Sequence, residues 1–451
     1  MIHPARITGL NSKPLAKGDY VLYWMQQSQR AEYNHALEYA IEKANELQIP
    51  PVVFFGITNN FPDANRRHYR FMLQGLRDVQ ASLEKRGIRF VVQDISPEKG
   101  AETLTQKASL LVTDRGYLKI QKKWRNKVAG SVPCSMVQVE SDVVVPLETA
   151  VQKEQYNAAA IRSKITPQLH EFMKPLGETK PRNSSRKLKF KHFDISDIDK
   201  ALNRLSINDD ISDITWLTGG TGNANKILDT FISHKLDRFG DLRNDPSRDY
   251  QSHLSPYLHF GQISPLYVAL KVSGTKSPGK DAFLEELIVR RELSMNFVHY
   301  NPHYDSLDAI PEWARATMKN HKKDKRPASY SVKELEQAAT HDSYWNTAQK
   351  EMIVRGKMHG YMRMYWGKKI IEWSKSPEEA YEFMLYLNNK YFLDGRDPNS
   401  YTGVAWCFGK HDRAWKERKV FGKVRYMNDK GLKRKFDIEA YVKKVEAWFV
   451  S

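Results

Sequence analysis

Cysteine is nearly absent from this chain of 451 residues, which contains only Cys134 and Cys407. So few thiols argue against a disulfide framework and against a cysteine-ligated zinc or iron–sulfur centre, and they indicate a reducing compartment, the cytoplasm. The fourteen histidines show no H-E-x-x-H or comparable ligand spacing, so no metal site is expected. The sequence also lacks a G-x-S-x-G elbow, and its first part lacks G-x-G-x-x-G, which argues against a serine hydrolase and a dinucleotide fingerprint.

Long apolar runs are missing too. No run approaches the roughly 18 apolar residues that a membrane helix needs, and residues 1–25 contain no apolar core of a signal peptide. The chain is instead rich in positive charge, with 71 Lys and Arg against 53 Asp and Glu, a net charge of +18. Such an excess indicates a polyanionic partner such as DNA, because each neutralised phosphate releases counterions. The alternative is a basic protein whose charge serves only its solubility.

The first third of the chain alternates between strands and helices. Short runs of β-branched and aromatic residues predict strands at 20–24, 51–57, 88–95, 110–114 and 136–146, and helical spacing of apolar residues predicts helices over 33–47 and 69–83. This order is typical of a doubly wound, Rossmann-like α/β domain with a parallel sheet, which we place at residues 1–173. Ligands of such folds bind beyond the carboxyl ends of the strands.

The composition changes after residue 173. Residues 174–223 hold prolines, serines and a basic run, which we interpret as a solvated linker between domains. At the end of this segment, TGGTGNANKILDTF (218–231) could seat a phosphate at a helix N-terminus, but no strand precedes it and no Gly-Lys-Ser/Thr follows, so a turn plus a helix is expected. Helical periodicity then dominates residues 224–451, which predicts an all-α second domain.

Three groups of polar residues could carry chemistry in the second domain. Ser252 and Ser255 could cap a helix or hold a phosphate, and the residues alone favour the cap. Glu286 and Arg290 stand four residues apart, which predicts either an ion pair on a helix face or, in a cleft, two groups facing DNA bases. Arg363 and Asp394 are candidates for a longer-range ion pair.

Tryptophans and tyrosines are numerous in the last third. Trp366 and Trp373 lie seven residues apart, so two helical turns place both rings on one face about 10 Å apart. With Trp345 nearby, they fit either a packed core or a chain of redox-active indoles. Residues 406–427 interleave aromatic and basic side chains, which suits either bases stacked on rings with phosphates held by cations, or aromatic helices packed together.

At this point the residues match a known family. The chain resembles the class II cyclobutane pyrimidine dimer photolyases of the photolyase and cryptochrome superfamily, and the likeness runs through essentially the whole sequence. The segments that carry it are, in order, YWMQQSQRAEYNHALEYA, DRGYLKIQKKWR, ESDVVVP, RNDP, LSPYLHFGQIS, FLEELIVRREL, MRMYWGKKIIEW and DGRDPNSYTGVAW. Eight blocks in the same order are far more specific than any single motif.

The resemblance implies a fold and an activity. It implies an N-terminal α/β domain that can carry an antenna chromophore, 8-hydroxy-5-deazaflavin rather than folate, and a helical domain that holds a U-shaped FAD. It implies a monomeric carbon–carbon lyase that binds UV-damaged DNA, single- or double-stranded, in the cytoplasm or on the nucleoid. Such an enzyme flips the pyrimidine dimer out of the DNA and splits it with an electron from photoexcited, reduced FAD.

The resemblance also implies roles for individual residues. The FAD phosphates would be held by Ser252, His253, Leu254 and Ser255, and the flavin ring by Asn388 at N5, by the ion pair of Arg363 with Asp394, and by Asp397. The dimer would be bound by Glu286, Arg290, Met364 and Trp406, and the DNA beside it by Arg243 and Arg425. Electrons would reach the flavin through the dyad of Trp366 and Trp345, with Trp373 as a neighbouring donor.

The sequence departs from the family pattern at two places. Arg290 stands where some class II members have a tryptophan, which would replace stacking on the dimer by a guanidinium. Phe239 stands where a tyrosine is common, which would remove one hydrogen bond to the cofactor. Two other functions are compatible with the composition: a cryptochrome-type blue-light receptor without repair activity, and a flavin-free basic DNA-binding protein. Such a receptor often has a C-terminal extension, whereas this sequence stops at Ser451, soon after its last predicted helix.

Overall fold

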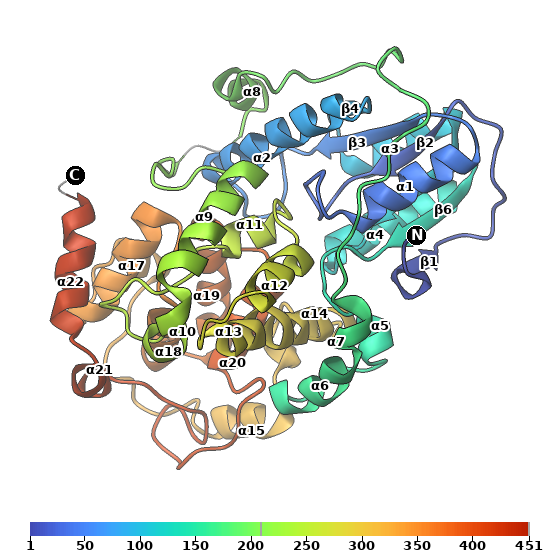
Figure 1. Ribbon diagram of the computed structural model, residues 1–451. Helices are drawn as coiled ribbons and strands as arrows, with labels where there is room; N and C mark the ends of the chain where they lie inside the picture. The colour runs from blue at the N-terminus through green and yellow to red at the C-terminus, as the bar shows by residue number, and fades with distance from the viewer. Residues whose placement is uncertain (208–209, 450–451) are drawn as a thin grey trace.

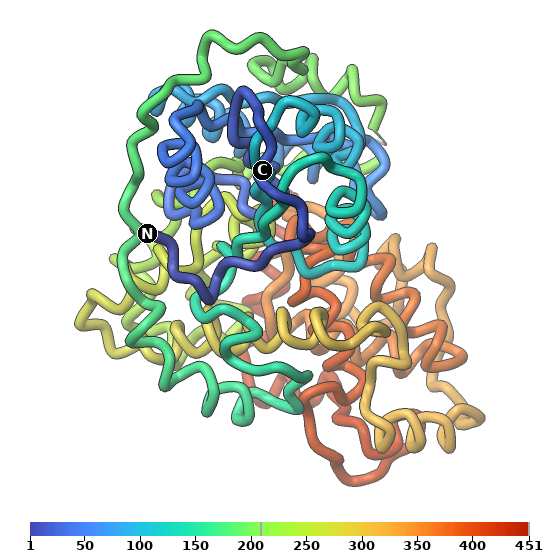
Figure 2. The backbone as a smooth tube through the Cα atoms, turned by 90° about the vertical axis from the view of Figure 1, so that its right-hand side faces the viewer, coloured from blue at the N-terminus to red at the C-terminus, as the bar shows by residue number. Residues whose placement is uncertain are grey.

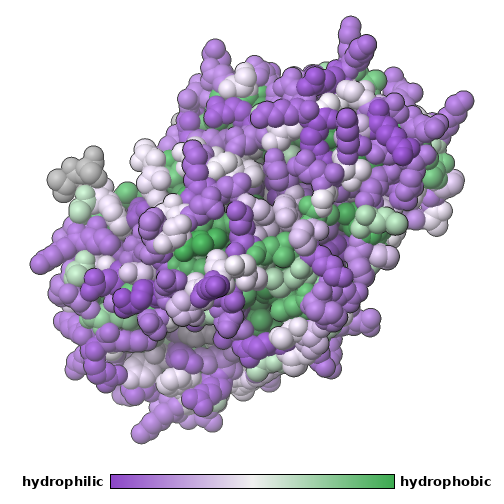
Figure 3. Space-filling view, viewed as in Figure 1, coloured by the Kyte–Doolittle hydropathy of each residue, from purple (hydrophilic) through white to green (hydrophobic). Residues whose placement is uncertain are grey.

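The computed structural model describes residues 1–207 and 210–449. A sheet flanked by helices forms one part, drawn at the upper right in Figure 1, and a larger helical part lies beside it. Charged and polar side chains cover most of the face seen in Figure 3, and apolar side chains gather in patches near its middle. Within the described residues, no helix is both long and apolar enough to cross a membrane.

The sheet has six strands in the order β1-β6-β5-β2-β3-β4. Its strands are β1 (Ile7–Gly9), β2 (Tyr20–Trp24), β3 (Pro51–Ile57), β4 (Arg89–Asp94), β5 (Ala108–Asp114) and β6 (Ser135–Val139). All neighbours run parallel except β1 and β6, which pair antiparallel. The parallel sheet is therefore confirmed, but the sequence did not predict β1, since three half-exposed edge residues carry no apolar pattern.

Helices cover both faces of the sheet, as a doubly wound fold requires. One face packs on α1 (His35–Glu46) and α2 (Arg66–Lys85), and the other on α3 (Pro97–Leu104) and α4 (Lys119–Ser131). Along β2 the side chains alternate between the two faces: Val21 and Tyr23 join the first core, and Leu22 and Trp24 the second. The strand is buried along its whole length, which explains its continuous run of apolar residues.

The strand expected at 136–146 ends early, at Val139. The apolar residues that follow do not join the sheet, because their backbone is held from the helical part. The N–H groups of Val144 and Val145 donate to Glu292 Oε1, at 2.6 and 3.4 Å. The segment is buried as deeply as a strand, so hydrophobicity alone could not distinguish the two structures.

The helical part is built from many short and medium helices. They are α5 (Leu147–Ala150), α6 (Ala158–Ile165), α7 (Leu169–Phe172), α9 (Thr221–His234), α10 (Leu236–Leu242), α11 (Ser255–His259), α12 (Pro265–Ser273), α13 (Lys280–Leu284), a π-helical turn (Glu285–Arg290), α14 (Arg291–Tyr300), α15 (Glu312–Asn320), α16 (Val332–Glu336), α17 (Ser343–Arg355), α18 (Gly360–Trp373), α19 (Pro377–Tyr391), α20 (Pro398–Cys407), α21 (Asp429–Lys435) and α22 (Ile438–Glu446). Their main core surrounds α17, α18, α19 and α20.

The described part of the basic segment, residues 174–207 and 210–223, runs along the outside of the sheet part, as the green tube in Figure 2 shows. Phe193 N–H donates to Val92 O at 2.7 Å, and α8 (Ile198–Arg204) packs on the same core as α1 and α2. Helices α5 to α7 instead pack with the helical part, so the domain boundary at this segment stays a prediction. The turn plus helix expected over 218–231 is confirmed: α9 begins at Thr221, and nearby side chains occupy the N–H groups of Gly219, Gly220 and Gly222.

A buried cluster of charges joins the two parts. Asp142, which follows β6, accepts a hydrogen bond from Arg291 of α14 at 2.8 Å and lies 3.4 Å from Arg30, which follows β2. Arg30 also donates to the carbonyl oxygens of Ser141 and Gly261, at 2.8 and 2.9 Å. Because all three charged side chains are buried, each guanidinium depends on the single carboxylate between them.

Replacing Asp142 by Asn should destabilise the protein strongly. The change keeps the size of the side chain but removes the carboxylate that contacts both buried guanidinium groups, at a cost of about 3 to 5 kcal/mol in the free energy of unfolding. Denaturant titration of the purified variant measures this. The matched control is Asp305→Asn, which removes an exposed ion pair with Lys119 and should cost less than about 1 kcal/mol. Equal losses in both variants would contradict the proposed role of the cluster.

Glu292 should make stability depend on pH. Burial raises the pKa of this carboxyl to about 8, against the opposing effect of the N–H groups of Val144 and Val145. The folded protein therefore keeps a proton that the unfolded chain releases above about pH 4.5, so this group makes the protein less stable as pH rises from about 4.5 to 8. Glu292→Gln should remove that part of the slope in denaturant titrations across this range. An unchanged slope would show that Glu292 is ionised in the folded protein.

Candidate functional site

The helical part contains a cavity of about 640 Å³, here called the main cavity. Its walls come from the end of α10, the loop before α11, the π-helical turn, the start of α18 and the loop before α20. Ten of the predicted site residues line it: Arg243, Ser252, His253, Ser255, Glu286, Arg290, Arg363, Met364, Asp394 and Asp397. Residues more than 150 positions apart in the sequence thus meet in one place.

The ion pair predicted between Arg363 and Asp394 is confirmed. Arg363 Nη2 lies 2.9 Å from Asp394 Oδ1 and 3.1 Å from Oδ2, and the guanidinium carbon lies 3.8 Å from the ring centroid of Phe392. Burial by itself raises the pKa of Asp394, but Arg363, the Ser255 hydroxyl and the charge of Lys357 together outweigh it and hold that pKa below the usual value. The cavity therefore has a fixed carboxylate and a fixed guanidinium side by side.

Lys357 also lines the main cavity, and sequence reasoning missed it. Its Nζ donates to His253 Nδ1 at 3.1 Å, and His253 Nε2 lies 2.7 Å from Asp249 Oδ1. Burial and the charge of Lys357 lower the pKa of His253 to about 4, so the imidazole is neutral at pH 7 with its proton on Nε2. No motif marks Lys357, because the loop that precedes α18 has no period.

The two serines do not cap a helix, so that interpretation was wrong. His253 adopts a left-handed conformation with φ of +57°, which turns the chain, and α11 begins only at Ser255. The cap position is taken by Leu254, which is buried and provides no side-chain hydrogen bond. Ser252 Oγ accepts from Leu254 N–H within the turn at 3.4 Å, and both serines line the main cavity.

The ion pair expected between Glu286 and Arg290 does not form. Residues 285–290 form a π-helical turn, in which neighbours along a face stand five residues apart rather than four. Arg290 therefore pairs with Glu285, at 3.2 Å, and Glu285 also binds Arg162 of α6. Glu286 pairs with Arg243 instead. Turns of this kind are frequent at functional sites, and here the turn aims Glu286 and Arg290 at the cavity.

The three predicted redox tryptophans form a continuous row of contacts. Trp366 and Trp345 stack with an interplanar angle of 8° and a centroid distance of 6.4 Å, and Trp373 meets Trp345 edge to face at 5.5 Å. Trp373 in turn contacts the rings of Tyr330 and His341, and His341 is exposed. The row thus leads from the buried core to the surface, although none of the three indoles lines the main cavity.

Asn388 and Trp406 are also outside the cavity lining. Asn388 of α19 is buried and donates to Asn389 Oδ1 at 3.0 Å. Trp406 is partly buried between the charges of Lys368 and Arg425, at 5.1 and 5.5 Å from its ring. Their expected contacts with a cofactor and a lesion stay predictions.

Arg425 lies in a cluster of aromatic and charged side chains after α20. Its guanidinium makes a two-point ion pair with Asp412, at 2.7 and 2.9 Å, and stacks 4.2 Å from the ring of Trp415, which is partly exposed. Trp415 lies in the segment 406–427, for which the sequence suggested base stacking, although this residue was not singled out. A flat indole held by an arginine at the surface is suited to stacking against an unpaired base.

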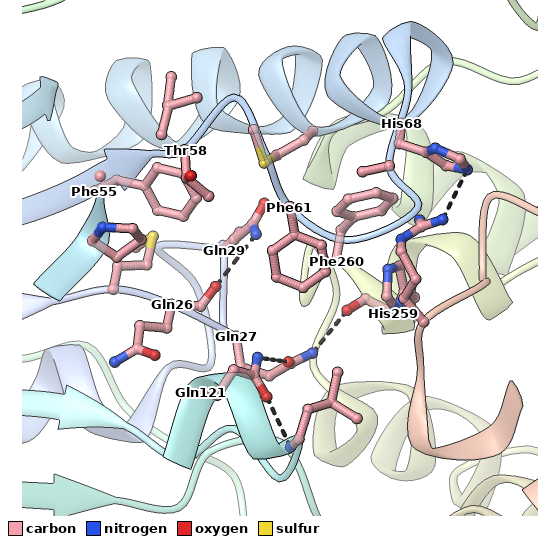
Figure 4. Close-up of a pocket in the computed structure, with 18 of the residues that line it drawn as sticks. Gln26, Gln27, Gln29, Phe55, Thr58, Phe61, His68, Gln121, His259 and Phe260 are labelled. Atoms are coloured by element: carbon pink, nitrogen blue, oxygen red, sulfur yellow. Dashed lines mark hydrogen bonds between the residues drawn. The ribbon is translucent and has the colours of Figure 1, made fainter. Parts of the chain in front are cut away.

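A second cavity, here called the sheet-edge cavity, lies beyond the carboxyl ends of β2 and β3 and has a volume of about 120 Å³ (Figure 4). Aromatic rings and glutamines line it, namely Phe55, Phe61, Trp124, Phe260, Gln26, Gln27, Gln29 and Gln121. The side-chain oxygens of Gln26 and Gln29 are buried without a hydrogen-bond partner. Two free acceptors among aromatic rings suit a flat heteroaromatic molecule with N–H or O–H groups.

The two cavities share a wall made of His259 and Asp397. His259 Nδ1 lies 3.1 Å from Asp397 Oδ2, and both residues line both cavities. Molecules in the two cavities would therefore both contact these side chains. Among the described residues, no group of histidine, cysteine or carboxylate side chains is arranged to hold a metal ion.

Known proteins resemble this chain in sequence and in fold. The family model described as DNA photolyase matches residues 21–182. A deoxyribodipyrimidine photo-lyase from Methanothermobacter thermautotrophicus is 52% identical over 449 residues, which cover 99% of this chain and 99% of that protein. One from Arabidopsis thaliana is 41% identical over 95% of this chain and 89% of that protein.

Solved structures resemble the fold at lower sequence identity. A class III photolyase from Agrobacterium tumefaciens superposes with a TM-score of 0.72 at 18% identity, over 95% of this chain and 87% of that one. A Synechocystis cryptochrome superposes with a TM-score of 0.74 at 14% identity, over 94% and 88% of the two chains. At such identities the likeness concerns the fold alone.

Proposed function

The chain belongs to the DNA photolyase family, and from this membership we propose that it is a class II photolyase that splits cyclobutane pyrimidine dimers in UV-damaged DNA under light. The observation that carries the proposal is the main cavity, which brings ten of the expected site residues together in a protein 52% identical over 99% of its length to a deoxyribodipyrimidine photo-lyase. The positive net charge of +18 supports DNA as the partner.

The residues of the main cavity fit FAD. The volume of about 640 Å³ lies within the range of roughly 300 to 1,000 Å³ that is usual for ligand pockets. Reduced FAD supplies a light-driven electron to the dimer when it is bound. Ser252 and Ser255 offer hydroxyls to its phosphates beside His253 and Leu254, and the pair of Arg363 with Asp394 presents opposite charges to its ring system.

The mouth of the same cavity would receive the flipped dimer. Glu286 and Met364 line it, so a carboxylate and an apolar side chain are available to the bases. Arg290 would offer a guanidinium there in place of an aromatic ring. Arg243 holds the Glu286 carboxylate in position before DNA binds, which reduces the rearrangement that binding requires.

The remaining residues would serve electron supply, light capture and DNA binding. Trp373, Trp345 and Trp366 would relay electrons inward from the exposed side, since their rings are in contact in that order. Asn388 would offer its amide to the flavin N5, and Trp406 and Arg425 would contact DNA. The sheet-edge cavity would hold an antenna chromophore, which the family resemblance makes 8-hydroxy-5-deazaflavin rather than folate, and its two free glutamine oxygens would accept hydrogen bonds from it.

Light should make the protein remove dimers from DNA. We expect purified protein loaded with reduced FAD to lower the dimer content of UV-irradiated DNA under blue or near-UV light and not in the dark, as measured by antibody or chromatography. DNA affinity should fall steeply with salt because several phosphates are neutralised. No loss of dimers in light would exclude repair and leave the cryptochrome-type receptor, whereas failure to bind flavin at all would exclude both.

Replacing Trp366 by Phe should stop electrons from reaching the flavin site from outside. The indole would no longer connect Trp345 to the interior, so blue light with an external reductant should no longer bleach the absorption of oxidised flavin. Repair by chemically reduced protein should persist.

The matched control is Trp24→Phe, which removes an equally buried indole from the sheet part and should photoreduce as the parent does. Equal photoreduction in the Trp366 variant would mean that electrons enter by another route.

A further inference from the structure

A third hollow, here called the basic cavity, has a volume of about 240 Å³ and adjoins the main cavity. The two share Gln251, His253 and Lys357. The other walls of the basic cavity come from the segment before α9, the end of α17 and the C-terminal helix α22. None of the residues contributed by these three segments was singled out in the sequence or used in the proposed reaction.

Arg355 is held rigidly at this cavity. Its guanidinium carbon lies 3.7 Å from the ring centroid of Trp216 and 4.2 Å from that of Trp448. Two indoles from separate segments of the chain therefore lie against this cation. Trp216 is fixed in turn, because its Nε1 donates to Arg355 O at 3.0 Å. Within residues 1–207 and 210–449, no carboxylate lies within 4 Å of the guanidinium. Stacking occupies the faces of a guanidinium and leaves its N–H edges able to bind an anion.

Two lysines add charge to the same walls. Lys357 Nζ donates to His253 Nδ1, and Lys444 Nζ donates to the carbonyl oxygen of Pro246. Neither ammonium has a carboxylate within 4 Å in the described part of the chain. Burial lowers the pKa of Lys357 to about 8 and also lowers the pKa of Lys444, and the nearby carboxylates offset this effect only in part.

The two acidic residues of the cavity are already engaged elsewhere. Asp249 binds His253 and Lys235, at 2.7 and 2.8 Å. Glu351 accepts hydrogen bonds from the Tyr441 hydroxyl at 2.6 Å and from His359 N–H at 3.3 Å, and burial raises its pKa. The cations Arg248, Arg355, Lys357 and Lys444 therefore line a small hollow, and neither of the two carboxylates among its described lining residues lies within 4 Å of any of them.

We propose that the basic cavity binds a phosphate group through Arg355, Lys357 and Lys444. Phosphate fits because it carries up to two charges, and because the planar fork of arginine matches two of its oxygens. The phosphate has two possible sources. It is either the pyrophosphate of the flavin dinucleotide, reaching in from the main cavity past the shared His253 and Lys357, or free phosphate from solvent. Only the first source rests on the proposed function.

The test uses two charge-removing variants, Arg355→Gln and Lys444→Gln, because loss of the stacked arginine alone could disturb folding. The matched control is Arg204→Gln, which removes an arginine stacked on Phe193 outside any of these cavities. Flavin-free protein is titrated with riboflavin, FMN and FAD by fluorescence quenching. Flavin-loaded protein is titrated with inorganic phosphate and pyrophosphate by calorimetry at constant ionic strength.

If the cofactor supplies the phosphate, each variant should bind FAD about tenfold more weakly while riboflavin affinity changes less than about twofold. If phosphate is free, each variant should instead lose about tenfold in affinity for inorganic phosphate or pyrophosphate. Parent-like affinities for all these ligands in both variants would overturn the proposal. Failure of the parent to bind even riboflavin would overturn the proposed function instead, and the phosphate titration would then decide the inference alone.

Discussion

The buried carboxylate of Asp142 is the interaction on which the arrangement of the molecule depends. It lies between Arg30 of the sheet part and Arg291 of the helical part, and all three side chains are buried. Charges buried in this way tolerate little change in geometry, because the attraction must offset a large desolvation cost. The sheet and the helices are thereby fixed relative to each other, and the sheet-edge cavity is built across the joint between them.

Ion pairs distinguish the three cavities. In the main cavity, Arg363 is matched with Asp394 and Arg243 with Glu286, so its walls are preorganised before any ligand enters. In the basic cavity, Arg355 and Lys444 have no such partner in the described residues. The sheet-edge cavity holds free amide oxygens among aromatic rings. Each cavity therefore suits a different chemistry: a charged and flat cofactor with its substrate, a phosphate, and a neutral heteroaromatic molecule.

Local sequence patterns predicted some contacts of the site correctly and others incorrectly. The pairing of Arg363 with Asp394 was expected and forms. The spacing of Glu286 and Arg290 predicted an ion pair that the π-helical turn prevents, since one extra residue per turn moves each side chain to a different neighbour. The serines before α11 looked like helix caps until the left-handed turn at His253 delayed the helix. Lys357 could not be found, because it lies in a loop without periodicity.

The sequence by itself determined the alternation of strands and helices, the all-helical second part and the family, because period and ordered motifs are local properties of the chain. Only the tertiary structure decided which charges are paired. Glu286 forms an ion pair with Arg243 rather than with Arg290, and Arg355 lies against two indoles rather than against a carboxylate. Which partner a buried charge contacts depends on segments far apart in sequence that pack in the same space. In that space the desolvation cost makes one pairing much more favourable in free energy than another.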